Sequence, residues 1–270
     1  MKLCLIGDSH AAMLIAAHRQ DPADEGLTVF AKPGLSDEDI RLEGPLLHAA
    51  SNDMRDRAAR MGTPDTLNLA EFDAVVVAGL APSAFAAVRL QQGHSVSGWP
   101  SGAKAVAQAL SDAPPARARP LMTRAAYLAA LTSLCETSLS ARIARAAPGP
   151  VAVIPQPFPS DALQDQDGTY PIIRRLLRQR DGAALAADLI AAHRAGFAPL
   201  PRTTYLPQPA DTLSHGCLTL AAFMRGGPRL SGGSGQDGDD VLHGNAALGA
   251  RLLTDLRTTL RRPAQTASNP

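Results

Sequence analysis

Two short motifs near opposite ends of the chain carry the residue types of a nucleophile and its base. The first, GDSH at 7–10, directly follows an apolar run, and the second, DVLH at 240–243, directly precedes a helical pattern. A serine hydroxyl such as that of Ser9 attacks a carbonyl when an imidazole such as that of His243 takes its proton. The carboxylate of Asp240 can hold that imidazole and stabilise its protonated form. The two motifs together therefore indicate hydrolysis or transfer of an acyl group.

Each motif also has a structural explanation when it is taken alone. Gly7 permits a tight exit from a strand, and Ser9 then lies at a helix N-terminus, where backbone amides can stabilise a developing anion. Asp and Ser are, however, also common helix-capping residues. A D-x-x-H sequence taken alone is better explained by a solvated Asp240 and a surface His243. The occurrence of both motifs at element junctions of one chain is what favours catalysis.

The elements that must position these residues follow from the pattern of apolar residues. Buried strands are predicted at 3–6, 27–31, 74–78 and 151–154, with a weaker one at 203–206. Helices are predicted at 11–19, 46–61, 103–110, 122–146, 171–195 and 246–260, and loops at 91–102 and 226–238. Strands that alternate with helices predict a parallel sheet covered on both faces. In such sheets the site forms beyond the carboxyl ends of the strands, where Ser9 is expected.

At these residues the sequence resembles the SGNH/GDSL hydrolases. That family carries its nucleophile in an N-terminal G-D-S block and its Asp and His in a C-terminal D-x-x-H block before the last helix. Gly7, Asp8, Ser9, Asp240 and His243 match these blocks. The resemblance implies a three-layer α/β/α fold of the flavodoxin-like type with a parallel five-stranded sheet. We expect one such domain over residues 1–261 and a disordered tail at 262–270.

The blocks that complete the family's oxyanion hole match less well. The resemblance assigns the oxyanion to amides at Ser9, Gly34 and Gly79, but Ala81 stands where the family has a donating Asn. Loss of one such donor typically lowers the rate by about 10²–10³. Three explanations remain: another donor, an enzyme that is slow or needs activated esters, or a fold that only binds. The candidates for another donor are Gln156, Gln208, His94 and Ser83.

The resemblance implies a serine esterase acting on carbohydrate esters or small acyl esters. In that reading Ser9 attacks the ester, His243 moves the proton and Asp240 orients His243. A glycan O-acyltransferase with the same triad is one alternative, and a non-catalytic carbohydrate-binding protein is the other. The residues expected to border the substrate are Asp8, His10, Ala81, Gln156 and Gln208.

Composition limits the remaining classes of function. Aromatic residues make up 4% of the 270 residues and the net charge is +1, which gives no case for nucleic acid or anionic membranes as partners. The three cysteines form no C-x-x-C pair, and no metal or other cofactor is expected. The sequence enters a strand almost at once, without the pattern of a signal peptide, so a cytoplasmic location is expected. The expected partner is a small-molecule or glycan ester, and the oligomeric state is left open.

Overall fold

The central sheet has five parallel strands, as the sequence predicts. The computed structural model describes residues 1–111, 119–166, 170–230, 235–236 and 240–261. The sheet order is β10-β9-β6-β1-β2, which in order along the chain is the flavodoxin-like arrangement 2-1-3-4-5. All four pairings are parallel, and the strands are β1 (Lys2–Gly7), β2 (Gly26–Ala31), β6 (Ala74–Ala78), β9 (Val151–Ile154) and β10 (Thr203–Tyr205).

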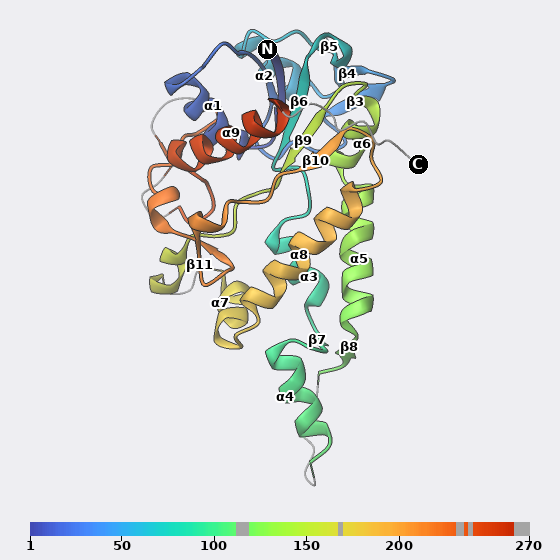
Figure 1. Cartoon of the computed structure of the whole chain (residues 1–270), viewed down its shortest axis with the longest axis vertical. Helices are drawn as coiled ribbons and strands as arrows, with labels where there is room; N and C mark the ends of the chain where they lie inside the picture. The colour runs from blue at the N-terminus through green and yellow to red at the C-terminus, as the bar shows by residue number, and fades with distance from the viewer. Residues whose placement is uncertain (112–118, 167–169, 231–234, 237–239, 262–270) are drawn as a thin grey trace.

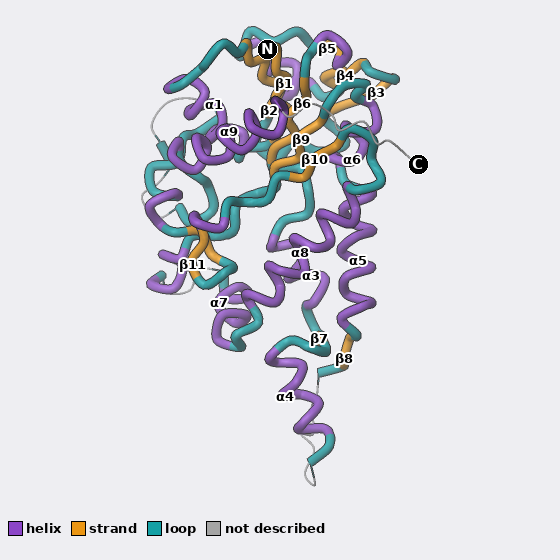
Figure 2. The backbone as a smooth tube through the Cα atoms, in the orientation of Figure 1, coloured by secondary structure: helices purple, strands orange, loops and turns teal. Residues whose placement is uncertain are grey.

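Helices cover both faces of this sheet and form a three-layer α/β/α fold (Figures 1 and 2). Alternate strand residues point to opposite sides, so Leu5 and Val76 pack against α1 (Ala11–Gln20) and α9 (Ala246–Arg261). Cys4 and Val75 belong to the larger cluster on the other side. The helices of that cluster are α2 (Asn52–Arg60), α3 (Ala84–Gln91), α5 (Arg124–Thr137), α6 (Leu139–Ala146), α7 (Pro171–Arg178) and α8 (Gly182–Phe197).

The helix predicted at 46–61 is wrong in its first part. Residues Leu46–Ala49 form strand β4, which pairs antiparallel with β3 (Ile40–Glu43) and β5 (Thr66–Asn68) in a small second sheet. Helix α2 begins only after Ser51, whose Oγ accepts a hydrogen bond from the Met54 amide and so caps the helix. The apolar residues before this cap satisfy either period, and strand pairing decides between them.

Two predicted helices are each divided into two. The helix at 122–146 breaks at Ser138, which ends α5 and caps α6 by accepting from the Ala141 amide. The helix at 171–195 breaks between α7 and α8, where Arg180 has a positive φ of 61°. Helix α3 was not predicted and is capped by Ser83. Local caps therefore set boundaries that the apolar pattern alone does not.

Helix α4 (Pro100–Ala109) lies at the end of an extension from the body (Figure 1). It starts earlier than predicted, inside the predicted loop 91–102, which also contains β7 (Ser95–Val96), the parallel partner of β8 (Leu121–Met122). The base of the extension is held by buried Trp99, whose Nε1 donates to Asp188 at 2.9 Å. The remaining strands are the short antiparallel pair β11 (Leu213–Ser214) and β12 (Leu218–Thr219).

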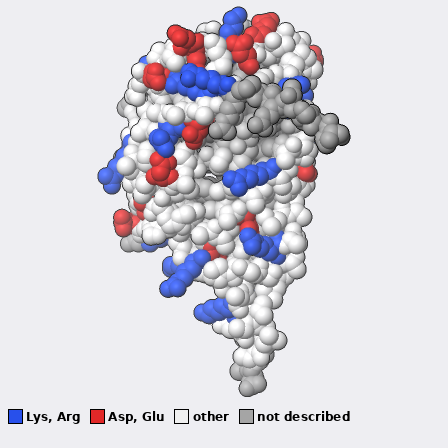
Figure 3. All heavy atoms as spheres, in the orientation of Figure 1, with Lys and Arg blue, Asp and Glu red and all other residues white. Residues whose placement is uncertain are grey.

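Three further features concern the expected domain and its surface. Among the described residues, no helix is both long and apolar enough to span a membrane. Figure 3 shows acidic and basic side chains interspersed over one face between large uncharged areas. The predicted tail 262–270 and parts of the predicted loop 226–238 lie outside the described residues. The single-domain assignment to 1–261 stays a prediction.

Candidate active site

Ser9, His243 and Asp240 form a continuous hydrogen-bonded chain at the carboxyl end of β1. The Oγ of Ser9 lies 3.0 Å from Nε2 of His243, and Nδ1 of the same ring lies 2.7 Å from Oδ2 of Asp240. Ser9 follows β1, whereas His243 precedes α9, and α1 and α9 pack side by side on one face of the sheet (Figure 1). This helix pair brings together residues that are 234 positions apart in the sequence.

Asp240 is oriented by its own loop. Its Oδ1 accepts hydrogen bonds from the amides of Leu242 at 2.7 Å and His243 at 3.3 Å, which leaves Oδ2 for the imidazole. Because a carboxylate only accepts, Nδ1 carries the proton of a neutral His243, and Nε2 is then free to accept from the Ser9 hydroxyl. The side chains of His243 and Asp240 are 22% and 15% exposed, so the pair is shielded but reachable from solvent.

The start of α9 fixes this loop in place. The Oδ1 of Asn245 accepts from the amides of Ala247 and Leu248 and so caps the helix. Its Nδ2 donates to the carbonyl oxygens of Ala222 and Arg225, on a segment distant in sequence. The backbone that carries His243 is therefore tied to α9 and to a second loop.

His10 packs on the imidazole of His243 and does not extend into open space. The two rings stack with centroids 4.9 Å apart, and His10 is buried. Burial, and then the charge of His243, lowers the pKa of His10 to about 3, so its ring is neutral at pH 7. A neutral ring on the face of His243 restricts how that ring can rotate. The predicted substrate contact of His10 is thus a contact with the candidate base, which depends on tertiary packing and has no sequence signal beyond adjacency to Ser9.

Asp8 is a buried carboxyl group that connects three segments at the site. Its Oδ1 accepts from the His10 amide at 2.9 Å, and its Oδ2 accepts from Nε2 of Gln156 at 3.0 Å. The same Gln156 nitrogen donates to the carbonyl oxygen of Gly79. Gly79 has a positive φ of 78°, and a Cβ there would collide with the Asp8 carboxyl group. Glycine is therefore required both by the backbone conformation and by the close approach of Asp8.

Burial raises the pKa of Asp8 to about 6 from 3.8, against its hydrogen bonds with His10 and Gln156. A carboxyl group with a raised pKa in the folded state stabilises the fold below its unfolded pKa and loses that contribution as pH rises through the folded pKa. As the pH rises from about 4 to about 7, the free energy of unfolding of wild type is therefore expected to fall by about 3 kcal/mol relative to that of Asp8→Asn. Urea unfolding of both proteins across this range measures the difference, with exposed Asp56→Asn as control. A pH-independent difference would contradict the expectation.

The three predicted oxyanion donors differ in availability. The Gly79 amide already donates to the carbonyl oxygen of Ile154 at 2.9 Å, so the prediction that it serves the oxyanion is corrected. Among the described residues, the amides of Ser9 and Gly34 have no hydrogen-bond acceptor. Gly34 occupies a turn with φ of 65°, which suits glycine. Ser9 and Gly34 remain as candidate donors.

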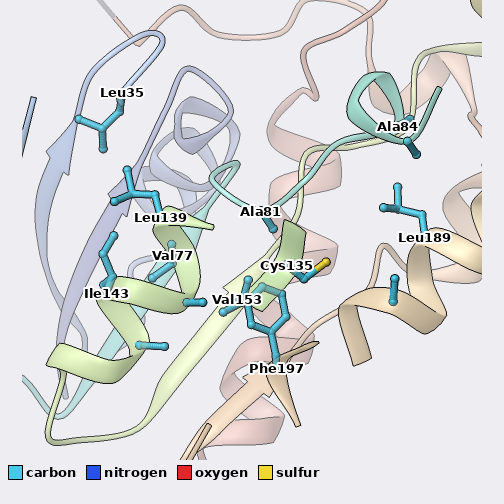
Figure 4. Packing of buried hydrophobic residues seen from close by; sticks show 14 of the residues in the cluster. Leu35, Val77, Ala81, Ala84, Cys135, Leu139, Ile143, Val153, Leu189 and Phe197 are labelled. Carbon is cyan, nitrogen blue, oxygen red and sulfur yellow. The ribbon is translucent and has the colours of Figure 1, made fainter. Parts of the chain in front are cut away.

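A hollow of about 520 Å³ is lined by Asp8, the residue before Ser9, and we refer to it as the Asp8 hollow; Ser9 and His243 themselves do not line it. Ala81 borders it with only 5% of its surface exposed, inside the packed cluster that Figure 4 shows, and its methyl group offers no donor. The Oγ of Ser83 accepts from the Ala86 amide and keeps its own proton available. The polar and small residues that line the hollow include Asp8, Gly34, Gly79, Ala81, Ser83 and Gln156, together with Ser36, Asp37, Ala86 and Ser138.

Gln208 does not belong to the site, and its predicted substrate contact is corrected. It is 8% exposed, and its Oε1 accepts from the Phe158 amide. Its Nε2 donates to the hydroxyls of Thr212 and Thr219. All its polar groups thus join loops together. Both glutamines stand in a P-Q-P sequence, at 155–157 and 207–209, so the sequence does not separate Gln208 from Gln156. His94 does not line the hollow either.

The fold and the site define an α/β protein with a serine, histidine and aspartate hydrogen-bonded in series at the carboxyl edge of its sheet. In the described part of the chain, no three His, Cys, Asp or Glu side chains are grouped so that they could hold a metal ion. No protein-family model and no curated protein matches the chain.

Among solved structures, the chain is similar to a carbohydrate esterase family 2 enzyme plus carbohydrate-binding domain from Corynascus thermopiles (Myceliophthora fergusii). The identity is 14%, the TM-score is 0.36, and the match covers 96% of this chain and 65% of that one. The chain thus spans less than two thirds of the length of that structure.

Proposed function

We propose that this protein is a serine ester hydrolase of the SGNH/GDSL type that cleaves carbohydrate esters or small acyl esters. The observation that carries the proposal is the chain from Ser9 through His243 to Asp240, with distances of 3.0 Å and 2.7 Å. Both lie within the range of about 2.6–3.2 Å in which a base activates a hydroxyl nucleophile and is itself oriented.

The reaction would proceed through an acyl-enzyme. The Oγ of Ser9 attacks the ester carbonyl carbon as its proton passes to Nε2 of His243, and Asp240 stabilises the imidazolium that forms. When the tetrahedral intermediate collapses, His243 gives this proton to the leaving alcohol oxygen. A water molecule then attacks the carbonyl carbon of the acyl group on Ser9 and loses its proton to His243, which returns this proton to Oγ of Ser9 as the acid is released.

The oxyanion would be held by the amides of Ser9 and Gly34. Because Ala81 replaces a side-chain donor, we expect about 10²–10³ less transition-state stabilisation than a complete hole gives. This deficit is expected to lower the hydrolysis rate least for esters with good leaving groups, whose intermediates form and collapse readily. Ser83 borders the Asp8 hollow, and its hydroxyl is a candidate for part of the missing hydrogen-bond donation.

The hollow next to Asp8 supports a small substrate. The Asp8 hollow, at about 520 Å³, is large enough for a sugar residue or a short acyl group and combines polar groups with apolar walls such as Leu80 and Leu139. His243 is 22% exposed, so water can reach an acylated Ser9.

Labelling with a fluorophosphonate tests the proposal directly. An activated Ser9 is expected to displace fluoride and gain one phosphonyl group, which intact-protein and peptide mass spectrometry would locate at residue 9. Urea-unfolded protein serves as the control, because activation by His243 requires the fold. Absence of labelling in folded protein, or equal labelling after unfolding, would refute the assignment.

A further inference from the structure

A second hollow, of about 390 Å³, lies beside the edge strand β2 and is not lined by Ser9 or His243. It is bordered by α1, β2, α2 and the turn at 228–230. Its walls combine half-buried apolar side chains with cations. The apolar surface includes Ile15, Val29 and Met61, and the positive charge includes that of Arg19, Arg57 and Arg60.

Arg57 is the unusual member of this set, because its charge is buried without a partner. The residue is 7% exposed, and its Nε and Nη2 are covered from solvent with no hydrogen-bond acceptor. Burial, and next the charge of Arg60, lowers the pKa of Arg57, while Asp53 opposes this. The carboxylate of Asp53, however, is engaged 3.3 Å from Nζ of Lys32. In the described part of the chain, Arg57 therefore lacks a counter-ion of its own.

An arrangement of this kind is costly unless something else completes it. Removing a charged group from water without a partner costs several kcal/mol, and arginine does not escape by losing its proton. A methionine or leucine at position 57 would fill the same place on α2 without this penalty. A ligand that enters the hollow can supply the missing negative charge.

The chemistry of the walls defines the ligand. The uncompensated positive charge of Arg57 on the wall of the hollow attracts a carboxylate or phosphate, and exposed Arg19 and Arg60 add positive potential at the rim. Ile15, Val29 and Met61 offer apolar surface that an inorganic ion would leave uncovered. We propose that this hollow, the Arg57 pocket, binds a small organic anion that carries a carboxylate or phosphate head on a short apolar body. The proposal does not depend on the ester hydrolase activity.

Titration with octanoate, inorganic phosphate and octanol separates the two parts of the ligand. Octanoate at about ten times its Kd is expected to raise the Tm of wild type by about 2–4 °C, with smaller shifts for phosphate and octanol at equal concentration. If octanol raised the Tm as much as octanoate does, the proposed role of the charge would be overturned. If inorganic phosphate raised the Tm as much as octanoate does, the proposed role of the apolar body would be overturned.

The variant Arg57→Met tests the site itself. By isothermal titration calorimetry, its Kd for octanoate is expected to be at least about 10-fold weaker than that of wild type, while its Tm without ligand is equal or higher. Exposed Arg60→Met, which should fold in any case, is expected to weaken binding about 2–5-fold by lowering the rim potential. Arg89→Met, an exposed arginine at the end of α3, is the matched control and should leave Kd unchanged. Unchanged octanoate affinity in Arg57→Met and Arg60→Met would overturn the proposal, including the case in which octanoate binds at Ser9.

Discussion

Ser9→Ala is expected to lower hydrolysis of p-nitrophenyl acetate by about 10⁴-fold or more, to near the rate of the uncatalysed reaction. The alanine keeps the turn after β1 but removes the oxygen that would form the acyl-enzyme. What remains is binding and the two candidate amide donors. The absence of a donor at Ala81 makes this remainder small. The measurement is the initial rate over a range of enzyme concentrations, which separates a residual rate from background.

The control for this prediction is Ser133→Ala, an exposed serine on α5 distant in sequence from the site. It should keep wild-type activity, and both variants should keep the wild-type Tm, because neither removes a hydrogen bond of the core. Retention of activity in Ser9→Ala would mean that another group performs the reaction. Loss of activity in Ser133→Ala would indicate damage to the fold.

Asp240→Asn is expected to lower kcat by about 10⁴-fold with little change in stability. The Asn Oδ1 can still accept from the amides of Leu242 and His243, and Asn245 still anchors the loop. The Asn Nδ2, however, donates, so Nδ1 of His243 must become the acceptor and Nε2 must carry the proton. In that tautomer His243 cannot take the proton of Ser9. The loss of activity thus comes from the wrong tautomer of His243, while the geometry of the loop stays intact.

This prediction is checked by comparing kcat and Tm of Asp240→Asn with those of Asp255→Asn, an exposed aspartate on α9. Asp255→Asn should match wild type in both quantities. If Asp240→Asn kept more than about a tenth of the wild-type kcat, the carboxylate would not be controlling the tautomer. Fluorophosphonate labelling should slow in parallel with kcat, because both reactions need the same base.

The central sheet could be predicted because β1, β6 and β9 are short apolar runs that are buried on both faces. The edge strands β2 and β10 are more exposed, and β10 gave the weaker pattern. The strand at 151–154 was predicted with the boundaries that the structure shows. Helix boundaries were less predictable, since a single capping serine decides them. Ser51 delays α2 and Ser138 divides α5 from α6, and in both cases the apolar pattern continues across the break. The small sheet was missed because the apolar residues of β4 fit a helical period as well, and only pairing with β3 and β5 decides between the two.

The candidate site divides in a similar way. The sequence by itself determined the sheet, and it determined which serine, histidine and aspartate to test, because G-D-S and D-x-x-H are local patterns of residue type. Only the tertiary structure decided that Gly79 has no free amide, that Gln208 is structural, and that His10 stacks on His243. These outcomes depend on which acceptor or ring the fold places within about 3–5 Å, and hydrogen bonds and ring contacts act only over such distances. The same holds for Arg57, whose burial without an acceptor arises from how α2 packs against β2 and β4.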